Sequence, residues 1–303
     1  MANPMPKIYV QILNYQNWED TIKCVRDFLA QEAIDLKVLV IDNASPDGSY
    51  EKLESEFQTH PQVELLQTGE NGGYAKGNNF GLAFLQDKVF DYLLISNNDV
   101  KLENPKLLYS LIRQHQELPN IAFLAPAMFV DGQEDQKHQA WRLPRFRDEV
   151  MASLRILYFI GKHTIQTSRY QFPPSAMDPQ KVDCLSGSFF LSTKAVMEEL
   201  GGFDENTFLY GEETILGHKI KDLGLQNYLW RAQRYYHDQG GTTTRLHSLL
   251  QLQRYWLDST LYYQAHYRNL AGWKLLILKF LYFCWVLETL LIQIFPKRTL
   301  RND

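Results

Sequence analysis

The stretch LKVLVIDNASPDG, residues 36–48, decides the expected fold. Leu36–Ile41 is a mostly apolar run rich in β-branched residues, which is typical of a buried strand. The run ends at Asp42, and Asp47-Gly48 marks a turn before a segment with helical spacing that reaches about Phe57. The stretch therefore predicts a strand followed by a helix, which is the repeating unit of an α/β protein.

The same alternation extends outward over the first 125 residues. Further strand-like runs are Lys7–Leu13, Val63–Leu66, Tyr92–Ser96 and Ile121–Ala125. Between them, apolar residues recur at helical spacing in 18–29 and in about 75–85, and Pro105 can open another helix. We therefore predict an α/β fold with a mainly parallel sheet flanked by helices.

The second half of the chain is less regular at first. Residues 128–183 contain a hydrophilic stretch and a Pro-Pro pair, so we expect an excursion from the sheet of the kind that carries substrate specificity. Regular patterns then return, with a strand-like run at Cys184–Ser192, helices at about 193–200 and 212–223, and a strand over 228–236 before His237. The pattern of residues 246–303 predicts a helical C-terminal extension.

Polar side chains stand where several predicted strands of the first half end. They are Asn14, Asp42, Asn71 and Asn97–Asp99. In an open α/β sheet, ligands bind beyond the carboxyl ends of the strands. We therefore expect one binding cleft at this edge of the sheet.

Composition and charge limit the class of partner. The 303 residues carry a net charge of −4 and are 45% hydrophobic, which is enough for a sizeable core. Residues 251–303 are net positive and rich in apolar residues, so the main body is acidic. This distribution argues against nucleic acid and suggests an anionic membrane surface for the C-terminus. The three cysteines form no CxxC pair, which disfavours a cysteine-based zinc site, and the lack of an apolar leader predicts a cytoplasmic location.

Three common motifs are missing from the sequence. They are G-x-G-x-x-G after the first strand, the phosphate loop G-x-x-x-x-G-K-[ST], and the G-x-S-x-G elbow of hydrolases. Hydride transfer, ATP hydrolysis and serine-type acyl transfer are therefore disfavoured. In contrast, Ser96–Asp99 places a carboxylate and two amides after a strand, which suits Mg²⁺ or Mn²⁺ with substrate phosphates completing the shell.

Five segments, in this order, resemble motifs of the family 2 glycosyltransferases, and of their rhamnosyltransferase and galactofuranosyltransferase branch in particular. They are Val40–Gly48 (VIDNASPDG), Glu70–Asn79 (ENGGYAKGNN), Leu94–Val100 (LISNNDV), Gly201–Glu213 (GGFDENTFLYGEE) and His237–Thr242 (HDQGGT). The resemblance covers about residues 7–245 and implies the GT-A fold. Residues 1–245 would form the transferase domain, with a nucleotide-binding half at about 1–127, an acceptor-binding half at about 128–245, and the helical segment 246–303 behind it.

The resemblance also implies a role for each matching residue. The donor nucleotide would be bound by Asn14, Asp42, Asn71, Lys76, Asn78 and Asn98. A divalent cation, Mn²⁺ or Mg²⁺, would be held by Asp99 and His237. Asn97 stands where many relatives have a first acid, a departure that implies a less tightly held metal. The glycines at 72, 73 and 77 would let the backbone approach the donor.

Glu213 occupies the position of the family's catalytic base, and Glu212 precedes it. On a helix the two side chains point about 100° apart, so only one need face the substrate. That carboxylate would deprotonate the acceptor hydroxyl, which then displaces the nucleoside diphosphate with inversion. Ile215 replaces an acid of the family pattern. We expect Trp141 and Arg142 to line the acceptor side.

These residues predict an inverting, metal-dependent glycosyltransferase of surface-polysaccharide synthesis. The branch favours a dTDP-rhamnose donor, then UDP-sugars, and a glycan or a lipid-linked acceptor. Two alternatives stay open, a nucleotidyltransferase and a non-catalytic family member that only binds sugar nucleotides. For residues 271–295 we predict an interfacial helix on the inner face of the cell membrane; the alternatives are a helix packed on the domain or on a second subunit in an oligomer.

Overall fold

A central ten-stranded sheet organises the chain. The computed structural model describes residues 5–153, 168–173, 178–237, 246 and 248–294. The strands of this sheet are β1 (Lys7–Asn14), β2 (Asp35–Asp42), β3 (Val63–Gln67), β4 (Tyr92–Asn97), β5 (Val100–Lys101), β6 (Ile121–Val130), β7 (Gln133–Glu134), β9 (Gln180–Val182), β11 (Phe189–Thr193) and β12 (Gln226–His237). A separate small sheet pairs β8 (Ala140–Trp141) with β10 (Cys184–Leu185).

The strand order confirms the predicted mainly parallel sheet. It runs β3-β2-β1-β4-β11-β6-β12-β5, and the first four strands are parallel to their neighbours. β11 is inserted antiparallel between β4 and β6, while β12 is parallel to β6. The parallel half therefore has its carboxyl ends at one edge, as the α/β pattern predicts.

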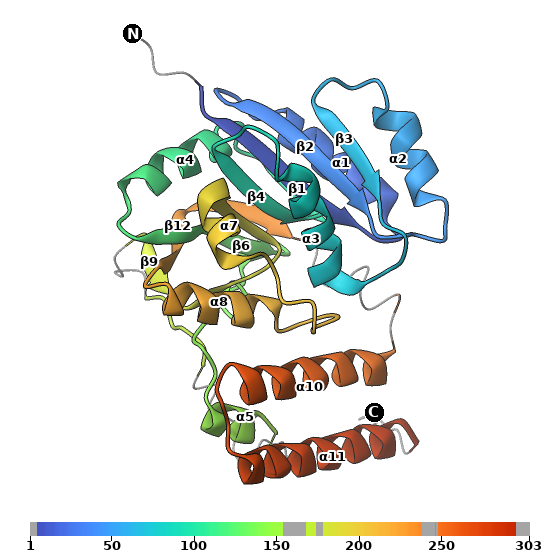
Figure 1. Cartoon of the computed structure of the whole chain (residues 1–303), viewed down its shortest axis with the longest axis vertical. Helices are drawn as coiled ribbons and strands as arrows, with labels where there is room; N and C mark the ends of the chain where they lie inside the picture. Colours follow the sequence, from blue (N-terminus) through green and yellow to red (C-terminus); the bar gives the residue numbers. More distant parts are fainter. Residues whose placement is uncertain (1–4, 154–167, 174–177, 238–245, 247, 295–303) are drawn as a thin grey trace, which may run out of the picture.

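Helices cover both faces of the sheet (Figure 1). On one face lie α1 (Trp18–Leu29), α2 (Ser49–Phe57) and α4 (Leu107–Glu117), and on the other lie α3 (Gly73–Leu85), α7 (Lys194–Leu200) and α8 (Glu212–Asp222). Each strand packs against both layers of helices, because successive side chains point to opposite faces of the sheet. Ile8 and Val10 pack with the first set of helices, and Tyr9 packs with the second. Burial on both faces explains the near-continuous apolar runs of the sequence.

Three further helices form a layer beyond α8, in the lower part of Figure 1. They are α5 (Phe146–Ser153), α10 (Leu249–His266) and α11 (Gly272–Ile294), and their shared core is built around Leu257, Leu278 and Tyr282. This arrangement confirms the predicted helical C-terminal region. α10 is fixed to the sheet domain by hydrogen bonds, since the hydroxyls of Tyr262 and Tyr267 donate to the Asp204 carboxylate at 2.9 and 2.7 Å.

α11 has one buried face and one exposed apolar face. Leu278 and Tyr282 are buried against the neighbouring helices. The opposite face exposes Trp273, Leu276, Ile277, Phe280, Phe283 and Leu287. In the part of the chain that the structure describes, no helix is long and apolar enough to span a membrane. The basic residues 297, 298 and 301 lie outside the described residues.

Candidate active site

The polar strand ends meet at one edge of the sheet. Register pairs Asn14 with Asp42 across β1 and β2, and Leu13 with Asn97 across β1 and β4. From the other end of the strand order, β12 brings His237 opposite Val100 of β5, which follows Asn97 by three positions. Residues of four strands that are far apart in the sequence therefore lie close together at this edge of the sheet.

A buried hydrogen-bond network holds the ends of β1, β2 and β4 in place. The Asn14 amide donates to Asp42 Oδ2 at 2.7 Å, and the Asn98 amide donates to Asn14 Oδ1 at 3.3 Å. The Thr21 hydroxyl joins both asparagines, since it donates to Asn14 Oδ1 at 2.8 Å and accepts from Asn98 at 2.9 Å. All four side chains are buried. The structure thus brings Asn14, Asp42 and Asn98 together as a support of the strand ends, and their contact with a nucleotide stays a prediction.

The glycine-asparagine loop is also tied to the sheet. Asn71 Oδ1 accepts from the Asn43 amide at 2.9 Å and from Gly73 N at 3.1 Å. Gly73 has φ 84°, and a Cβ there would lie 2.2 Å from Phe208 O, so glycine lets the start of α3 contact the 203–211 segment. Likewise, Cβ atoms at Gly72 and Gly77 would collide with Lys76 and Leu13. The space that a side chain would need at each of these three glycines is therefore occupied by other atoms of the protein.

Asn78 and Lys76 lie on opposite sides of α3. Asn78 is fully buried, where it accepts from Gln11 Nε2 at 2.8 Å and donates to Tyr74 O at 3.0 Å. Lys76 is half exposed, 3.8 Å from Glu70. Asn78 is therefore hydrogen-bonded inside the protein, away from the surface of the loop, whereas the Lys76 side chain can reach solvent. The predicted nucleotide contacts of both residues are untested.

Asp99 and His237 form a close pair. Asp99 Oδ1 lies 3.0 Å from His237 Nε2, and both side chains are largely buried, with 13% and 9% exposed. Asp99 Oδ1 and His237 Nδ1 have no hydrogen-bond partner among the described residues. The Asn97 amide lies 3.4 Å from the same His237 nitrogen. The remainder of the motif that begins at His237, residues 238–242, lies outside the described residues.

This pair fits a divalent cation only with help from a substrate. Among the described residues, the His, Cys, Asp and Glu side chains form no cluster of three or more that could hold a metal. A carboxylate oxygen without a hydrogen bond, beside an imidazole, is nevertheless a donor set that a hard or borderline ion accepts. Mg²⁺ is commonly bound through one or two protein ligands plus substrate phosphates.

A tight turn delivers two carboxyl groups to the start of α8. Tyr210 (φ 70°) and Gly211 (φ 87°) are both left-handed, and the helix begins at Glu212. Glu212 is buried, and its Oε1 has no hydrogen-bond partner among the described residues, whereas Glu213 is partly exposed. Burial, and then the charge of Glu213, raises the pKa of Glu212 to about 8. Burial also raises the pKa of Glu213, so the pair favours one retained proton near neutral pH.

The loop between β10 and β11 connects the two halves of the site. Gly187 N donates to Glu213 Oε1 at 3.2 Å, and Gly187 O accepts from the Tyr74 hydroxyl at 2.8 Å. A Cβ at position 187 would lie 2.8 Å from Glu213 Oε1, so only glycine allows this approach. The next residue, Ser188, accepts from Asn97 N at 2.9 Å through its carbonyl. One loop therefore touches both the Glu213 carboxylate and the strand end that carries Asp99.

Sequence reasoning missed this loop and its partner Tyr74. The interval Ser186–Ser188 lies inside what was predicted as one continuous strand, Cys184–Ser192, and it divides that run into β10 and β11. Its signal in the sequence is a Ser-Gly-Ser interruption of an apolar run, since glycine within a strand often marks a close approach.

Trp141 and Arg142 lie on the α8 side of the site. Trp141 Nε1 donates to Thr214 Oγ1 at 3.1 Å, which joins β8 to the residue after Glu213. Arg142 donates to Arg169 O at 2.9 Å and stacks over the Tyr170 ring at 4.4 Å. The structure thus brings Trp141 to Thr214, the residue after Glu213, and directs the Arg142 guanidinium toward the 168–173 segment. An acceptor contact for either residue stays a prediction.

Ile215 explains one departure from the expected motif. It is fully buried and packs with Cys184, Leu143 and Tyr263 of α10. An acid at this position would be a buried charge without a partner, which is costly. The apolar residue therefore belongs to the contact between α8 and the C-terminal helical layer.

Comparison with known proteins gives a consistent result. The family model described as glycosyl transferase family 2 matches residues 9–201. The chain is 28% identical over 217 residues to the N-acetylglucosaminyl-diphospho-decaprenol L-rhamnosyltransferase of Mycobacterium tuberculosis, an alignment that covers 68% of each chain. It is also 23% identical over 223 residues to the rhamnosyltransferase WbbL of Escherichia coli, covering 72% of this chain and 78% of WbbL.

Solved structures show the same fold. The chain superposes on GalNAc-T7, solved with UDP, GalNAc and Mn²⁺, with a TM-score of 0.59 and 14% identity, covering 78% of this chain and 44% of that one. For a mannosyltransferase from Pyrobaculum calidifontis, solved with GDP-Man and Mn²⁺, the TM-score is 0.54 at 16% identity, with 84% and 63% covered. The fold is the GT-A fold, as the sequence predicts; the shared part spans less than two thirds of either structure.

Proposed function

This chain belongs to glycosyl transferase family 2, and we propose that it is an inverting enzyme that moves a sugar from a nucleotide-diphosphate donor to a hydroxyl of a glycan or lipid-linked acceptor. The single observation that carries the proposal is the Ser186–Ser188 loop. Gly187 contacts Glu213 and Ser188 contacts the Asn97 backbone, so this loop links the Glu213 carboxyl group to the strand end before the Asp99–His237 pair, which supports one shared substrate site.

Glu213 is the proposed base. Its Oε1 is oriented by Gly187 N, and its partial exposure leaves it open to an acceptor hydroxyl. Burial raises its pKa, which makes the carboxylate a stronger base than a solvated glutamate once it is deprotonated. Glu212 is enclosed, so we assign it the role of tuning the Glu213 charge. In the proposed reaction the acceptor oxygen attacks the anomeric carbon from the face opposite the nucleotide, which inverts the configuration.

Asp99 and His237 would hold a divalent cation, Mn²⁺ or Mg²⁺, together with the donor diphosphate. When bound, such an ion neutralises negative charge on the leaving diphosphate. The support is the pair's 3.0 Å separation and the buried Asp99 oxygen that makes no hydrogen bond among the described residues. Both structural neighbours described above were solved with Mn²⁺.

The relatives favour rhamnose as the transferred sugar. Two of them are named as rhamnosyltransferases, although a third relative, Agl10 of Haloferax volcanii, is named as a hexosyltransferase of glycan biosynthesis at 21% identity. We therefore propose dTDP-rhamnose first and UDP-sugars second. The mycobacterial relative is named after the lipid-linked compound N-acetylglucosaminyl-diphospho-decaprenol. This name supports a lipid-linked acceptor for the present chain as well.

We propose that α11 attaches the protein to the inner face of the cell membrane. Six exposed apolar side chains follow one face of the helix, and Lys274 and Lys279 are on the same helix. Aromatic residues favour the bilayer interface, and lysines favour anionic headgroups. The opposite face packs on α5 and α10, so the helix would lie in the interface with its other side still bound to the protein.

A donor screen followed by product analysis tests this function. Sugar nucleotides with and without Mn²⁺ are screened for thermal stabilisation of the full chain, because a true ligand stabilises by mass action. The best donor is then incubated with the purified protein. Release of nucleoside diphosphate supports the proposal, release of inorganic diphosphate would indicate a nucleotidyltransferase, and binding without turnover would indicate a non-catalytic member.

A further inference from the structure

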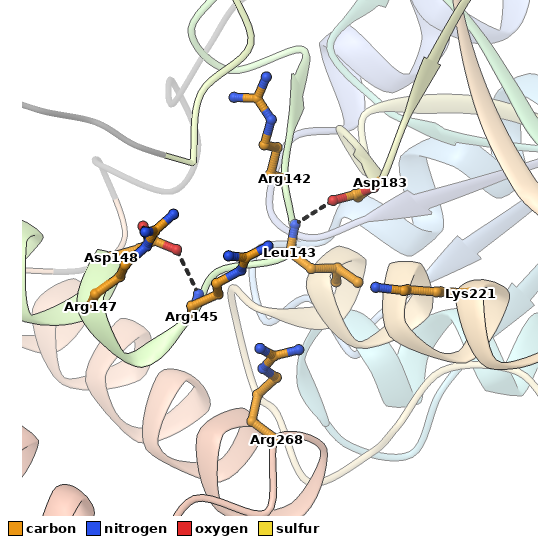
Figure 2. A pocket seen from close by; sticks show the side chains of 8 residues that line it. All are labelled: Arg142, Leu143, Arg145, Arg147, Asp148, Asp183, Lys221 and Arg268. Atoms are coloured by element: carbon orange, nitrogen blue, oxygen red, sulfur yellow. Dashed lines mark hydrogen bonds and ion pairs between the residues drawn. The ribbon is translucent and has the colours of Figure 1, made fainter.

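A cavity of about 300 Å³ lies between the α8 end of the site and the C-terminal helices. Its lining, drawn in Figure 2, is unusually rich in cations: Arg142, Arg145, Arg147, Lys221 and Arg268, with Leu143 and the acids Asp148 and Asp183. Three different parts of the chain supply the cations, namely the segment from the end of β8 into the first turn of α5, the last turn of α8, and the residues after α10.

The acids of this cavity are already engaged by the protein. Asp183 Oδ2 accepts from Leu143 N at 2.9 Å, and Asp148 Oδ2 accepts from Arg145 N at 2.8 Å. Arg147 lies 3.7 Å from the Asp148 carboxylate. The two acids therefore neutralise only part of the positive charge around the cavity.

Among the described residues, the remaining cations have no ion-pair partner. Arg145, Lys221 and Arg268 make no ion pair with any described residue, and their side chains point toward the space beside Leu143 (Figure 2). Burial lowers the pKa of His218, the charge of Asp222 opposes this shift, and the charges of Arg268 and Lys221 add to it. Converging cations of this kind suit a group with several negative oxygens, such as a phosphate or diphosphate.

The cavity is placed to serve the same acceptor as Glu213. Lys221 follows Glu213 by eight positions along α8, which is about 12 Å of helical rise. Trp141, which contacts Thr214 beside Glu213, is joined directly to Arg142 at the cavity rim. On its other side, Arg268 precedes α11 and its exposed apolar face by a few residues. The cavity thus lies between the proposed base and the proposed membrane surface.

We propose that Arg145, Lys221 and Arg268 bind the phosphate or diphosphate group of a lipid-linked acceptor, while its sugar reaches Glu213 and its lipid chain leads toward α11. This inference rests on the proposed function and adds the residues that recognise the acceptor. A protein phosphate or a soluble nucleotide is disfavoured, since neither would use an apolar surface next to the cavity.

Binding of farnesyl diphosphate to the full chain, measured by titration calorimetry with farnesol as the uncharged comparison, tests the proposal. We expect the diphosphate to bind and farnesol to bind far more weakly. Arg145→Gln and Arg268→Gln should each raise the Kd for farnesyl diphosphate by on the order of tenfold, because each removes a charge-assisted contact. Arg113→Gln, an equal change of charge at an exposed position of α4, is the matched control and should leave the Kd unchanged. Lys221→Gln provides a third variant if either arginine change prevents folding.

Three results would overturn the proposal. Unchanged Kd values in the folded pocket variants would show that the cavity is not the site. Weakening by Asp99→Ala as strong as that by Arg268→Gln would show that the probe occupies the donor site. Loss of binding to phosphatidylglycerol vesicles by the pocket variants, with farnesyl diphosphate binding intact, would assign the cations to lipid headgroups. Nucleoside diphosphate release by the wild-type chain is measured separately, so failure of the proposed function is distinguishable from failure of this subsite.

Discussion

Asp99 Oδ1 and His237 Nε2 lie 3.0 Å apart, although Asp99 lies in the turn between β4 and β5 of the N-terminal half and His237 ends the last strand of the sheet. The contact is made because β5, directly after Asp99, pairs antiparallel with the end of β12. A two-residue strand thus brings together the two side chains that the family resemblance assigns to one metal.

Removal of metal should therefore suppress activity. We expect EDTA to abolish transfer and Mn²⁺ or Mg²⁺ to restore it. Asp99→Ala and His237→Ala should each raise the Mn²⁺ concentration needed for half-maximal activity by at least about tenfold, since even indirect ligand partners cost that much. Activity is measured across a Mn²⁺ titration, with Asp87→Ala, in the α3–β4 loop, as the control. Full activity after exhaustive chelation would contradict this prediction. It would indicate that the enzyme, which has Asn97 in place of an acid, works without a metal.

The pH dependence should report the carboxyl pair. Because burial raises the pKa of both Glu212 and Glu213, and the base acts when deprotonated, kcat/KM should rise with pH through the neutral range. Glu212 keeps its proton while Glu213 ionises, so Glu212→Gln replaces one neutral group by another, and the rising limb should keep its position. Profiles of both proteins that are flat from about pH 6 to about pH 9 would argue against a buried carboxylate base.

The exposed face of α11 should control membrane binding. Phe280→Ser with Phe283→Ser should weaken binding to anionic liposomes by about tenfold or more, because each removes apolar area from the interface. Val89→Ser, at a hydrophobic residue that is 83% exposed in a loop, is the matched control. Co-sedimentation is measured at low salt, where attraction of the lysines is strongest. If the wild-type protein does not bind the liposomes at low salt, we would instead assign the exposed face of α11 to a contact with a second subunit.

Glu149 should make the helical layer less stable at alkaline pH. It is buried in α5, where the Tyr282 hydroxyl of α11 donates to it at 3.4 Å, and burial raises its pKa to about 7. The folded chain therefore holds the proton more tightly than the unfolded chain, so stability is highest below about pH 4.5 for this group and falls as the pH rises to about 7. The loss approaches about 3 kcal/mol at most.

Glu149→Gln tests this reasoning. The glutamine stays neutral, so the variant should melt at a higher temperature than wild type at about pH 8 and at a similar temperature near pH 5. Glu117→Gln, at an exposed residue of α4, should show no such difference. A Glu149→Gln variant that is destabilised equally at both pH values would mean that the carboxyl group matters through its shape and hydrogen bonds alone.

Much of the N-terminal half could be predicted because its strands are covered on both faces. Such strands read as apolar runs, and their ends are marked by polar residues such as Asp42 and Asn97. The residue-level site was harder. Asn14, Asp42 and Asn98 are predicted to bind nucleotide, which stays a prediction; local sequence does not reveal that their side chains also hydrogen-bond to one another.

The parts that escaped prediction depend on contacts between distant segments. Tyr74 and Gly187 are 113 positions apart, and only the folded sheet brings them to Glu213. Similarly, the two faces of α11 are both apolar, so periodicity alone left open whether it packs on the protein or lies on a membrane. The structure gives one face to α5 and α10 and leaves the other exposed.

The most direct test of the account is the transfer rate of Glu213→Gln, measured beside its donor affinity. Glutamine keeps the size and the hydrogen bond from Gly187 N but accepts no proton, so we expect transfer to fall about 10²- to 10⁴-fold while the donor Kd changes little. Glu199→Gln, at an exposed position of α7, is the matched control. Turnover of the Glu213→Gln enzyme within tenfold of wild type, about 1.4 kcal/mol of barrier, would contradict the assignment of Glu213 as the base.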